Sequence, residues 1–253
     1  MKSPQRPERP TIYSLILIMR LSWINPNTPD VTFKLFPQGM SNNNIYVIIE
    51  RGAREVGNAA PLKWGKPLVI EIRFQGRGGQ GAVVASEILG RALFDEGKYP
   101  QSFSVFGGER RGAPVRGYLR VDNKPILLKC QIKKPDHEIV FDLTLTEDLD
   151  FPSELKPDGI ILVNTHLGID AFEKIRSFKL GLVDASSIAR SAGLGHTLNT
   201  AILGAYVRLT GLVRMQTMIE TVRKMVPSKI DANIRALERG FETVHIYTPQ
   251  EMH

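Results

Sequence analysis

Cysteine is almost absent from this sequence, since Cys130 is the only one among 253 residues. A single thiol cannot close an internal disulfide, which argues against an extracellular protein stapled by disulfides. One thiol also cannot hold an iron–sulfur cluster, which typically takes about four thiolates. We expect Cys130 to be a partly buried core residue on a strand rather than a catalytic nucleophile.

Long apolar runs are also missing, and no stretch approaches the roughly 20 apolar residues that span a bilayer. An apolar burst at residues 12–24 follows Lys2, Arg6 and Arg9, as in a signal peptide. Arg20 interrupts that burst, however, and no Ala-x-Ala cleavage pattern follows it. We therefore expect a cytoplasmic protein without a membrane segment.

A large excess of basic charge is missing from residues 70–253, the part of the chain that shows regular hydrophobic patterns. The net charge is +7, but residues 1–69 hold nine Lys and Arg against four Asp and Glu, whereas the remainder holds 24 against 22. Because most of the basic excess lies outside the patterned part, the sequence does not indicate a nucleic-acid partner.

The N-terminal quarter differs from the rest in composition. Residues 1–69 contain eight of the 16 prolines, an Asn42-Asn43-Asn44 run and no sustained hydrophobic period. We expect residues 1–68 to be an extension that is poorly ordered or lies upstream of the true start. The patterned domain, residues 69–253, opens at Val69, and our hypothesis is that a GTG codon for this valine is the real start. The intact mass of the native protein tests this, and a full-length mass refutes it.

Strand and helix patterns alternate after Val69. Short β-branched or nearly continuous apolar runs predict strands at 69–74, 102–106, 139–143, 159–164 and 180–184, and a 3.6-residue stripe predicts a helix at 82–94 that ends at Gly97. Runs at 115–121 and 126–130 flank Asp122-Asn123 and predict an antiparallel hairpin.

The C-terminal third is expected to be helical, at residues 199–211 and 215–226 and in a last helix. Ser228 and Asp231 form a capping-box-like start to that last helix. The fold class that follows is α/β, with three α/β/α layers and a mostly parallel, mixed central sheet.

A glycine-rich segment lies between the first predicted strand and the first helix, the context in which the G-x-G-x-x-G spacing has a physical meaning. Glycines permit a tight turn and a close approach of backbone N–H groups to an anion, and the helix N-terminus adds about half a positive charge. An arginine at this position can neutralise a phosphate and a glutamine can donate to it. The alternative is a turn that only packs strand on helix. The segment, called the glycine loop below, comprises Gly76, Arg77, Gly78, Gly79, Gln80 and Gly81.

The acidic residue of a dinucleotide site is missing from its expected position. An NAD site requires an acid about 20 residues after the loop, at the end of the second strand, to hold the ribose. Asp95 and Glu96 fall at a helix end, and Glu109 comes too late, inside a basic loop. NAD binding is therefore weakly supported.

Three segments, in order, resemble the γ subunits of pyruvate and related 2-oxoacid:ferredoxin oxidoreductases. The first is Ile70-Glu71-Ile72-Arg73-Phe74 running into the glycine loop, the second is the Glu-Arg-Arg-Gly loop within 106–116, and the third is the helix signature at 199–205 that ends near 210–213. Their spacing and order agree with the family from about Val69 to about Phe241.

The resemblance implies a subunit that is inert alone, with no catalytic or metal-ligating residue of its own. Its complex would convert a 2-oxoacid and coenzyme A into acyl-CoA and CO₂, passing electrons to ferredoxin. In the family, thiamine diphosphate and [4Fe-4S] clusters lie on partner subunits of an α, β, γ, δ set. The glycine loop, Arg110 and Arg111 would then hold the phosphates of coenzyme A, although the arginine pair equally suits partner docking.

The sequence is also compatible with other functions. The small subunit of indolepyruvate:ferredoxin oxidoreductase shares this domain, and the chain also suits a free-standing nucleotide-binding module, an NAD-dependent dehydrogenase or a structural scaffold. The sequence does not name the 2-oxoacid, so pyruvate is only the default.

Overall fold

The computed structural model describes residues 31–33, 46–51, 69–106, 112–128, 130–145 and 151–249. Within these residues, nine strands form one mixed sheet in the order β1-β2-β4-β5-β3-β6-β7-β8-β9. Their bounds are β1 Val31–Phe33, β2 Tyr46–Arg51, β3 Ile70–Arg77, β4 Tyr99–Phe106, β5 Pro114–Asp122, β6 His137–Val140, β7 Ile160–Asn164, β8 Lys179–Val183 and β9 His245–Tyr247.

A parallel block forms the centre of the sheet. Strands β3, β6, β7 and β8 run parallel to one another, with Ile72 opposite His137 and Ile161 opposite Leu180. Antiparallel strands flank this block, because β5 pairs with β3 on one side and β9 pairs with β8 on the other. The expected α/β class with a mixed sheet is confirmed.

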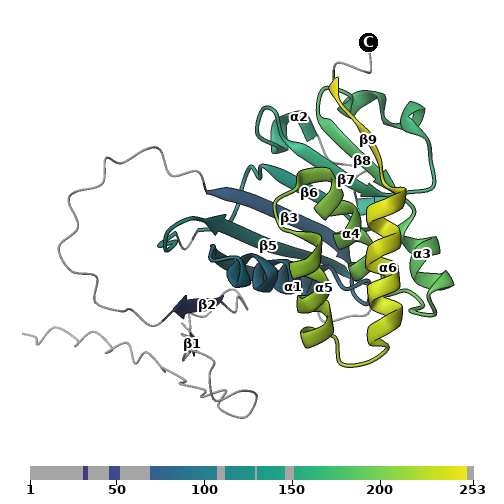
Figure 1. Ribbon diagram of the computed structural model, residues 1–253. Coiled ribbons are helices and arrows are strands. Elements are labelled where there is room, and N and C mark those ends of the chain that lie inside the picture. The colour runs from purple at the N-terminus through teal and green to yellow at the C-terminus, as the bar shows by residue number, and fades with distance from the viewer. Residues whose placement is uncertain are drawn as a thin grey trace, which may run out of the picture.

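The helices form layers on both faces of the sheet (Figure 1). They are α1 Ala82–Asp95, α2 Phe151–Glu154, α3 Ala185–Ser191, α4 Asn199–Thr210, α5 Met215–Met225 and α6 Ile230–Thr243, with 3-10 segments η1 Leu143–Leu145 and η2 Ile169–Ile175. On the front face, α1 packs on β3, β4 and β5, α4 packs on β7 and β8, and α5 and α6 cover α1 and α4. The expected helical C-terminal third is confirmed.

Alternation along the strands divides the buried side chains between two faces. Ile72, Phe74 and Leu119 face α1 in the main front core. On the rear, Val140, Ile161 and the other apolar residues of the parallel strands pack with Phe172 and Ile175 of η2.

Two glycines set the crossing of α4 and α6. A Cβ on Gly204 would lie 1.8 Å from the Leu237 carbonyl oxygen, and a Cβ on Gly240 would lie 1.9 Å from that of Ala201. Real Cβ atoms do not approach other atoms this closely, so the two helix backbones touch only because both positions lack a side chain. The crossing holds α4, whose first residue borders the glycine loop, against the C-terminal helix.

A buried polar layer lies on the rear face of β3, β5 and β6. Arg73, 4% exposed, donates from Nε to Glu138 Oε2 at 2.7 Å and from Nη2 to Glu154 Oε2 at 3.0 Å. Glu138 is fully buried and also accepts from Gln75 Nε2 at 2.7 Å. Burial raises the pKa of Glu138 to about 7, against the opposing influence of the Arg73 charge.

The predicted hairpin around Asp122 and Asn123 is wrong. Residues 126–128 form no strand, and both edges of β5 are occupied, by β4 and by β3. Strand β5 instead forms its hairpin with the preceding strand β4. Cys130 was expected to be partly buried on a strand, but it is exposed in an irregular segment.

The predicted cap of the last helix is also wrong. Helix α6 begins at Ile230 after Lys229, which adopts a left-handed conformation (φ 53°), and no side chain caps it. The Ser228 carbonyl oxygen instead accepts from Asn233 Nδ2 at 3.3 Å.

Within the described part of the chain, no helix combines the length and apolar character that crossing a membrane requires.

Candidate functional site

The glycine loop lies where β3 meets α1, at the carboxyl end of the parallel strands. Gly76 is pressed against its neighbours, since a Cβ there would lie 3.0 Å from Phe141 Cβ and 3.1 Å from Ala82 Cβ. Gly79 (φ 100°) and Gly81 (φ 86°) adopt conformations that favour glycine. The sequence correctly predicted a tight strand-to-helix turn.

Arg77 is held by the protein itself. Its guanidinium donates from Nε to Asp142 Oδ2 at 3.1 Å, from Nη2 to Thr144 Oγ1 at 2.7 Å and from Nη1 to the Gly112 carbonyl oxygen at 3.2 Å. These bonds tie β3 to the segment after β6 and to the start of β5. Arg77 was expected to neutralise a phosphate, and three of its five N–H donors are engaged in shaping the loop.

Gln80 closes the same network. Its Oε1 accepts from the Arg77 backbone N–H at 2.7 Å, and its Nε2 donates to Asp142 Oδ2 at 3.2 Å. Burial opposes ionisation of Asp142, but the hydrogen bonds from Thr144 and Gln80 and the charge of Arg77 hold its pKa below the ordinary value. The carboxylate therefore stays ionised at neutral pH and fixes both side chains.

The start of α1 has backbone N–H groups that the helix does not use and that can bind an anion. The backbone N–H groups of Gly78 and Gln80 are used within the loop region, donating to the Ala113 and Arg77 carbonyl oxygens at 3.0 and 3.1 Å. The helical ladder begins with Ala85 donating to Gly81, so the N–H groups of residues 82–84 precede it. The first turn carries no acidic residue, which leaves the positive end of the helix dipole uncompensated.

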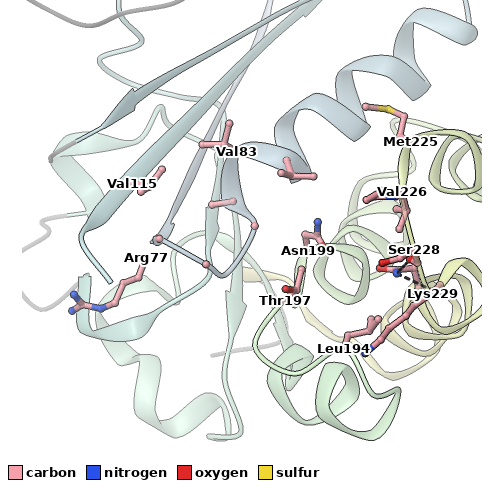
Figure 2. Close-up of a pocket in the computed structure, with 17 residues that line it drawn as sticks. Arg77, Val83, Val115, Leu194, Thr197, Asn199, Met225, Val226, Ser228 and Lys229 are labelled. Atoms are coloured by element: carbon pink, nitrogen blue, oxygen red, sulfur yellow. Dashed lines mark hydrogen bonds between the residues drawn. The ribbon is translucent and has the colours of Figure 1, made fainter. Parts of the chain in front are cut away.

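Two cavities of about 610 Å³ each meet at the tip of the loop. The first, called the apolar groove, runs between the start of α1 and the α5–α6 connection, and Figure 2 shows Arg77 pointing away from it. Its lining includes Val83, Met225, Val226 and Lys229.

The second cavity, called the polar cleft, lies on the other side of Gly78 and Gly79. It is lined by the loop, Gly112, Ser186, Arg190, His196 and their neighbours. The described residues that line the two cavities include Lys229, Arg77 and Arg190 but no Asp or Glu. Both cavities therefore favour an anionic ligand over a cationic one.

The carboxyl ends of β7 and β8 carry polar groups that bond to one another. Asn164 donates from Nδ2 to the Phe141 carbonyl oxygen and to Ser186 Oγ, both at 2.9 Å. Asp184 accepts from the Ser187 backbone N–H at 2.8 Å and thereby caps α3. These bonds join the start of α3 to the strand ends next to the loop.

The structure brings together all six predicted loop residues, whereas Arg110 and Arg111 lie outside the described residues. Sequence reasoning missed Arg190 and Lys229, which lie more than 100 residues along the chain and have no local motif. Asp95 and Glu96, the acids nearest the spacing of an NAD site, lie at the far end of α1, roughly 20 Å from the loop for a helix of this length. Asp95 pairs with Arg91 at 3.0 Å and Glu96 with Arg214 at 3.1 Å, so neither serves a nucleotide at the loop.

A metal centre is not found among the described residues, since no group of three His, Cys, Asp or Glu side chains comes together there.

Comparison with known proteins gives consistent matches. The family model described as pyruvate ferredoxin/flavodoxin oxidoreductase matches residues 71–243. The pyruvate/ketoisovalerate oxidoreductases common subunit gamma of Pyrococcus abyssi is 46% identical over 184 residues, 71% of this chain and 99% of that protein. The pyruvate synthase subunit PorC of Methanothermobacter marburgensis is 44% identical over 176 residues, 69% of this chain and 97% of that protein. The crystal structure of the pyruvate oxidoreductase subunit PORC of Thermotoga maritima has a TM-score of 0.61 at 38% identity, covering 70% of this chain and 98% of that chain.

Proposed function

Because the chain belongs to the pyruvate ferredoxin/flavodoxin oxidoreductase family as a γ-type subunit, we propose that it is the component of a 2-oxoacid:ferredoxin oxidoreductase complex that binds coenzyme A. The complex converts a 2-oxoacid, coenzyme A and two oxidised ferredoxins into acyl-CoA, CO₂, a proton and two reduced ferredoxins. The observation that carries the binding role is the open N-terminus of α1 at the junction of two cavities without acidic lining.

Coenzyme A combines several phosphates with a long, largely apolar arm that ends in a thiol. The start of α1, the loop tip and Arg190 offer N–H donors and positive charge for the phosphates. The apolar groove suits the arm, with Val83 and Val226 along it and Lys229 at its wall. Arg77 and Gln80 shape the loop through their bonds to Asp142, and both also line the polar cleft, where their remaining N–H groups can reach a phosphate. Arg110 and Arg111 are kept in the proposal as further phosphate ligands.

The redox groups are assigned to partner subunits. One cysteine supplies too few thiolates for an iron–sulfur cluster, and no three His, Cys, Asp or Glu side chains gather among the described residues. We assign thiamine diphosphate and [4Fe-4S] clusters to α, β and δ partners, where the thiamine group supplies the decarboxylation chemistry. The γ chain contributes co-substrate binding to that assembly.

Pyruvate is the first substrate to test, and 2-oxoisovalerate is the second, because relatives are named for pyruvate and ketoisovalerate oxidoreductases. The comparisons do not favour the indolepyruvate alternative, since the relatives from Pyrococcus abyssi and Methanothermobacter marburgensis are named as a gamma subunit and as PorC. The function is assigned to residues 69–253, and residues 1–68 are treated as an extension. The support is that a match to 71% of this chain spans 99% of a relative.

The binding role is tested by equilibrium dialysis of the full chain against coenzyme A and against NAD. We expect coenzyme A to bind and Arg190→Ala to weaken binding roughly tenfold, as loss of a charge-assisted hydrogen bond would. Arg239→Ala is the matched control, because Arg239 is an exposed residue of α6 outside both cavities. Tighter binding of NAD than of coenzyme A would contradict the proposal.

The role in a complex is tested by co-expression with the α, β and δ subunits. Ferredoxin reduction that requires both a 2-oxoacid and coenzyme A is expected, and comparison of pyruvate, 2-oxoisovalerate, 2-oxoglutarate and indolepyruvate names the substrate. A chain that co-purifies with no such subunit would refute this part of the proposal.

A further inference from the structure

The segment between β5 and β6 presents apolar side chains to solvent. Leu127 is 88% exposed and Leu128 is 46% exposed, although both belong to a run that reads as a core strand. Two adjacent leucines with this exposure are unusual on a surface that meets only water. The segment begins where β5 ends, at the opposite end of the sheet from the glycine loop, roughly 25 Å away along the eight residues of β3.

Four contacts fix this segment to the rear face of the sheet. Gln101 Nε2 donates to the Leu128 carbonyl oxygen at 2.9 Å, and Arg120 Nη2 donates to Cys130 Sγ at 3.7 Å. Gln131 Nε2 donates to the Tyr118 hydroxyl at 3.2 Å, while the Ile132 side chain is buried beside the stacked rings of Phe103 and Tyr118. The leucines are therefore presented by an anchored backbone.

The same segment is rich in lysine and holds no acidic residue. Residues 124–135 contain four lysines and no Asp or Glu, and Lys133 and Lys134 are exposed. Two carboxylates of the adjoining strand ends serve other partners, since Asp136 pairs with Lys156 at 2.9 Å and Glu71 pairs with Arg120 at 2.9 Å. A small anionic ligand would use the lysines but not two exposed leucines, so the combination fits a protein surface.

We propose that Leu127, Leu128, Lys133 and Lys134, called the leucine–lysine surface, dock an acidic, partly apolar surface of another subunit of the complex. The inference rests on the proposed function, because it requires partner subunits. The leucines supply contact area that loses water on assembly, and the lysines supply attraction and orientation. Docking here leaves the glycine loop and both cavities open for a ligand.

Cys130 makes the proposal measurable, because it is the only thiol of this chain, is exposed and lies beside the leucines. Its alkylation by N-ethylmaleimide is followed by mass spectrometry of its peptide, in the free full-length chain and in the assembled complex. We expect at least a tenfold slower reaction in the complex. The control is Glu173→Cys, at an exposed position of η2, whose thiol should react equally in both.

Paired variants test the two parts of the surface. L127D with L128D should weaken assembly at least roughly 10- to 100-fold, the factor expected when only one of the two leucines is fully buried in the interface. K133E with K134E should also weaken assembly, most strongly at low salt. Leu167→Asp and Lys174→Glu are matched controls from the connection between β7 and β8. Thermal unfolding of each free variant confirms that the exposed substitutions leave the fold intact.

Unchanged Cys130 reactivity in an assembled complex overturns the proposed surface and leaves the proposed function standing. Equal weakening by the controls, or an effect of the leucine pair without one of the lysine pair, also overturns it. Protection of Cys130 by anionic vesicles or by self-association, instead of by partner subunits, overturns it as well. A wild-type chain that assembles with no partner overturns both proposals.

Discussion

Replacing Arg73 by methionine should destabilise the protein strongly and in a pH-dependent way. Arg73 is almost fully buried and provides the ionic partner of Glu138, which has no exposed surface. Removing one member of a buried pair leaves the other charge uncompensated, which typically costs about 3–5 kcal/mol. We expect a loss of this size at pH 8, measured by urea denaturation with wild type at the same pH.

The pH dependence follows from the pKa of Glu138. Burial raises that pKa in the folded protein to about 7 from 4.5. The charge and hydrogen bond of Arg73 oppose this rise, so their loss raises the pKa further. A carboxyl whose folded pKa is raised contributes stability that is present below the unfolded pKa and lost as pH rises through the folded value. The deficit of Arg73→Met should therefore shrink as pH falls from 8 to 5.

Two controls separate the buried pair from the rest of the network. Glu154→Gln removes the outer partner of Arg73, which is 36% exposed, and should cost no more than about 1 kcal/mol. The double variant R73M/E138Q removes both buried charges and should recover most of the stability lost in Arg73→Met. Equal destabilisation by Arg73→Met at pH 5 and pH 8, or a double variant no better than the single one, would refute the reasoning.

Three further predictions concern the helices, the loop and the chain start. Gly240→Ala should lower the free energy of unfolding, measured by urea denaturation, by at least about 3 kcal/mol, because its Cβ meets the Ala201 carbonyl. In Gly79→Ala the new Cβ meets nothing within 4 Å, so only the left-handed backbone strain of about 1–2 kcal/mol is expected. Equal costs for the two variants would contradict the close crossing of α4 and α6. Arg77→Ala should raise the KM of the assembled complex for coenzyme A roughly tenfold, because the loop loses three hydrogen bonds, and an unchanged KM would show that the loop keeps its shape without them. A chain that starts at Val69 should fold and bind coenzyme A with unchanged affinity in the dialysis assay, and a tenfold loss would show that residues 1–68 belong to the functional unit.

Much of the fold follows from local sequence patterns. Apolar runs at β7 and β8 and the stripe of α1 predict the layers, because burial on one or both faces imposes those periods. The hairpin error shows the limit of such patterns. The run 126–130 has the composition of a strand, but β5 has no free edge to pair with it, and edge occupancy is a property of the whole sheet.

In the candidate site, too, the sequence predicts the locally determined residues but not those that packing brings from distant parts of the chain. The glycine loop was predictable because its conformation is local and positive φ angles at Gly79 and Gly81 require that residue type. Arg190 and Lys229 line the cavities beside the loop only because α3, α4 and α6 pack there, so no spacing in the sequence indicates them. The role of Arg77 was equally hidden, because its partners Asp142 and Thr144 lie 65 or more residues away.

The position of α1 has a consequence for folding during synthesis on the ribosome. This helix lies between the sheet and α5, which begins about 120 residues later in the chain. At typical translation speeds the ribosome needs on the order of 10 s to deliver that cover. During this interval the apolar outer side of α1 is available to chaperones, and a stall in synthesis between the two helices would leave a nascent chain prone to aggregation.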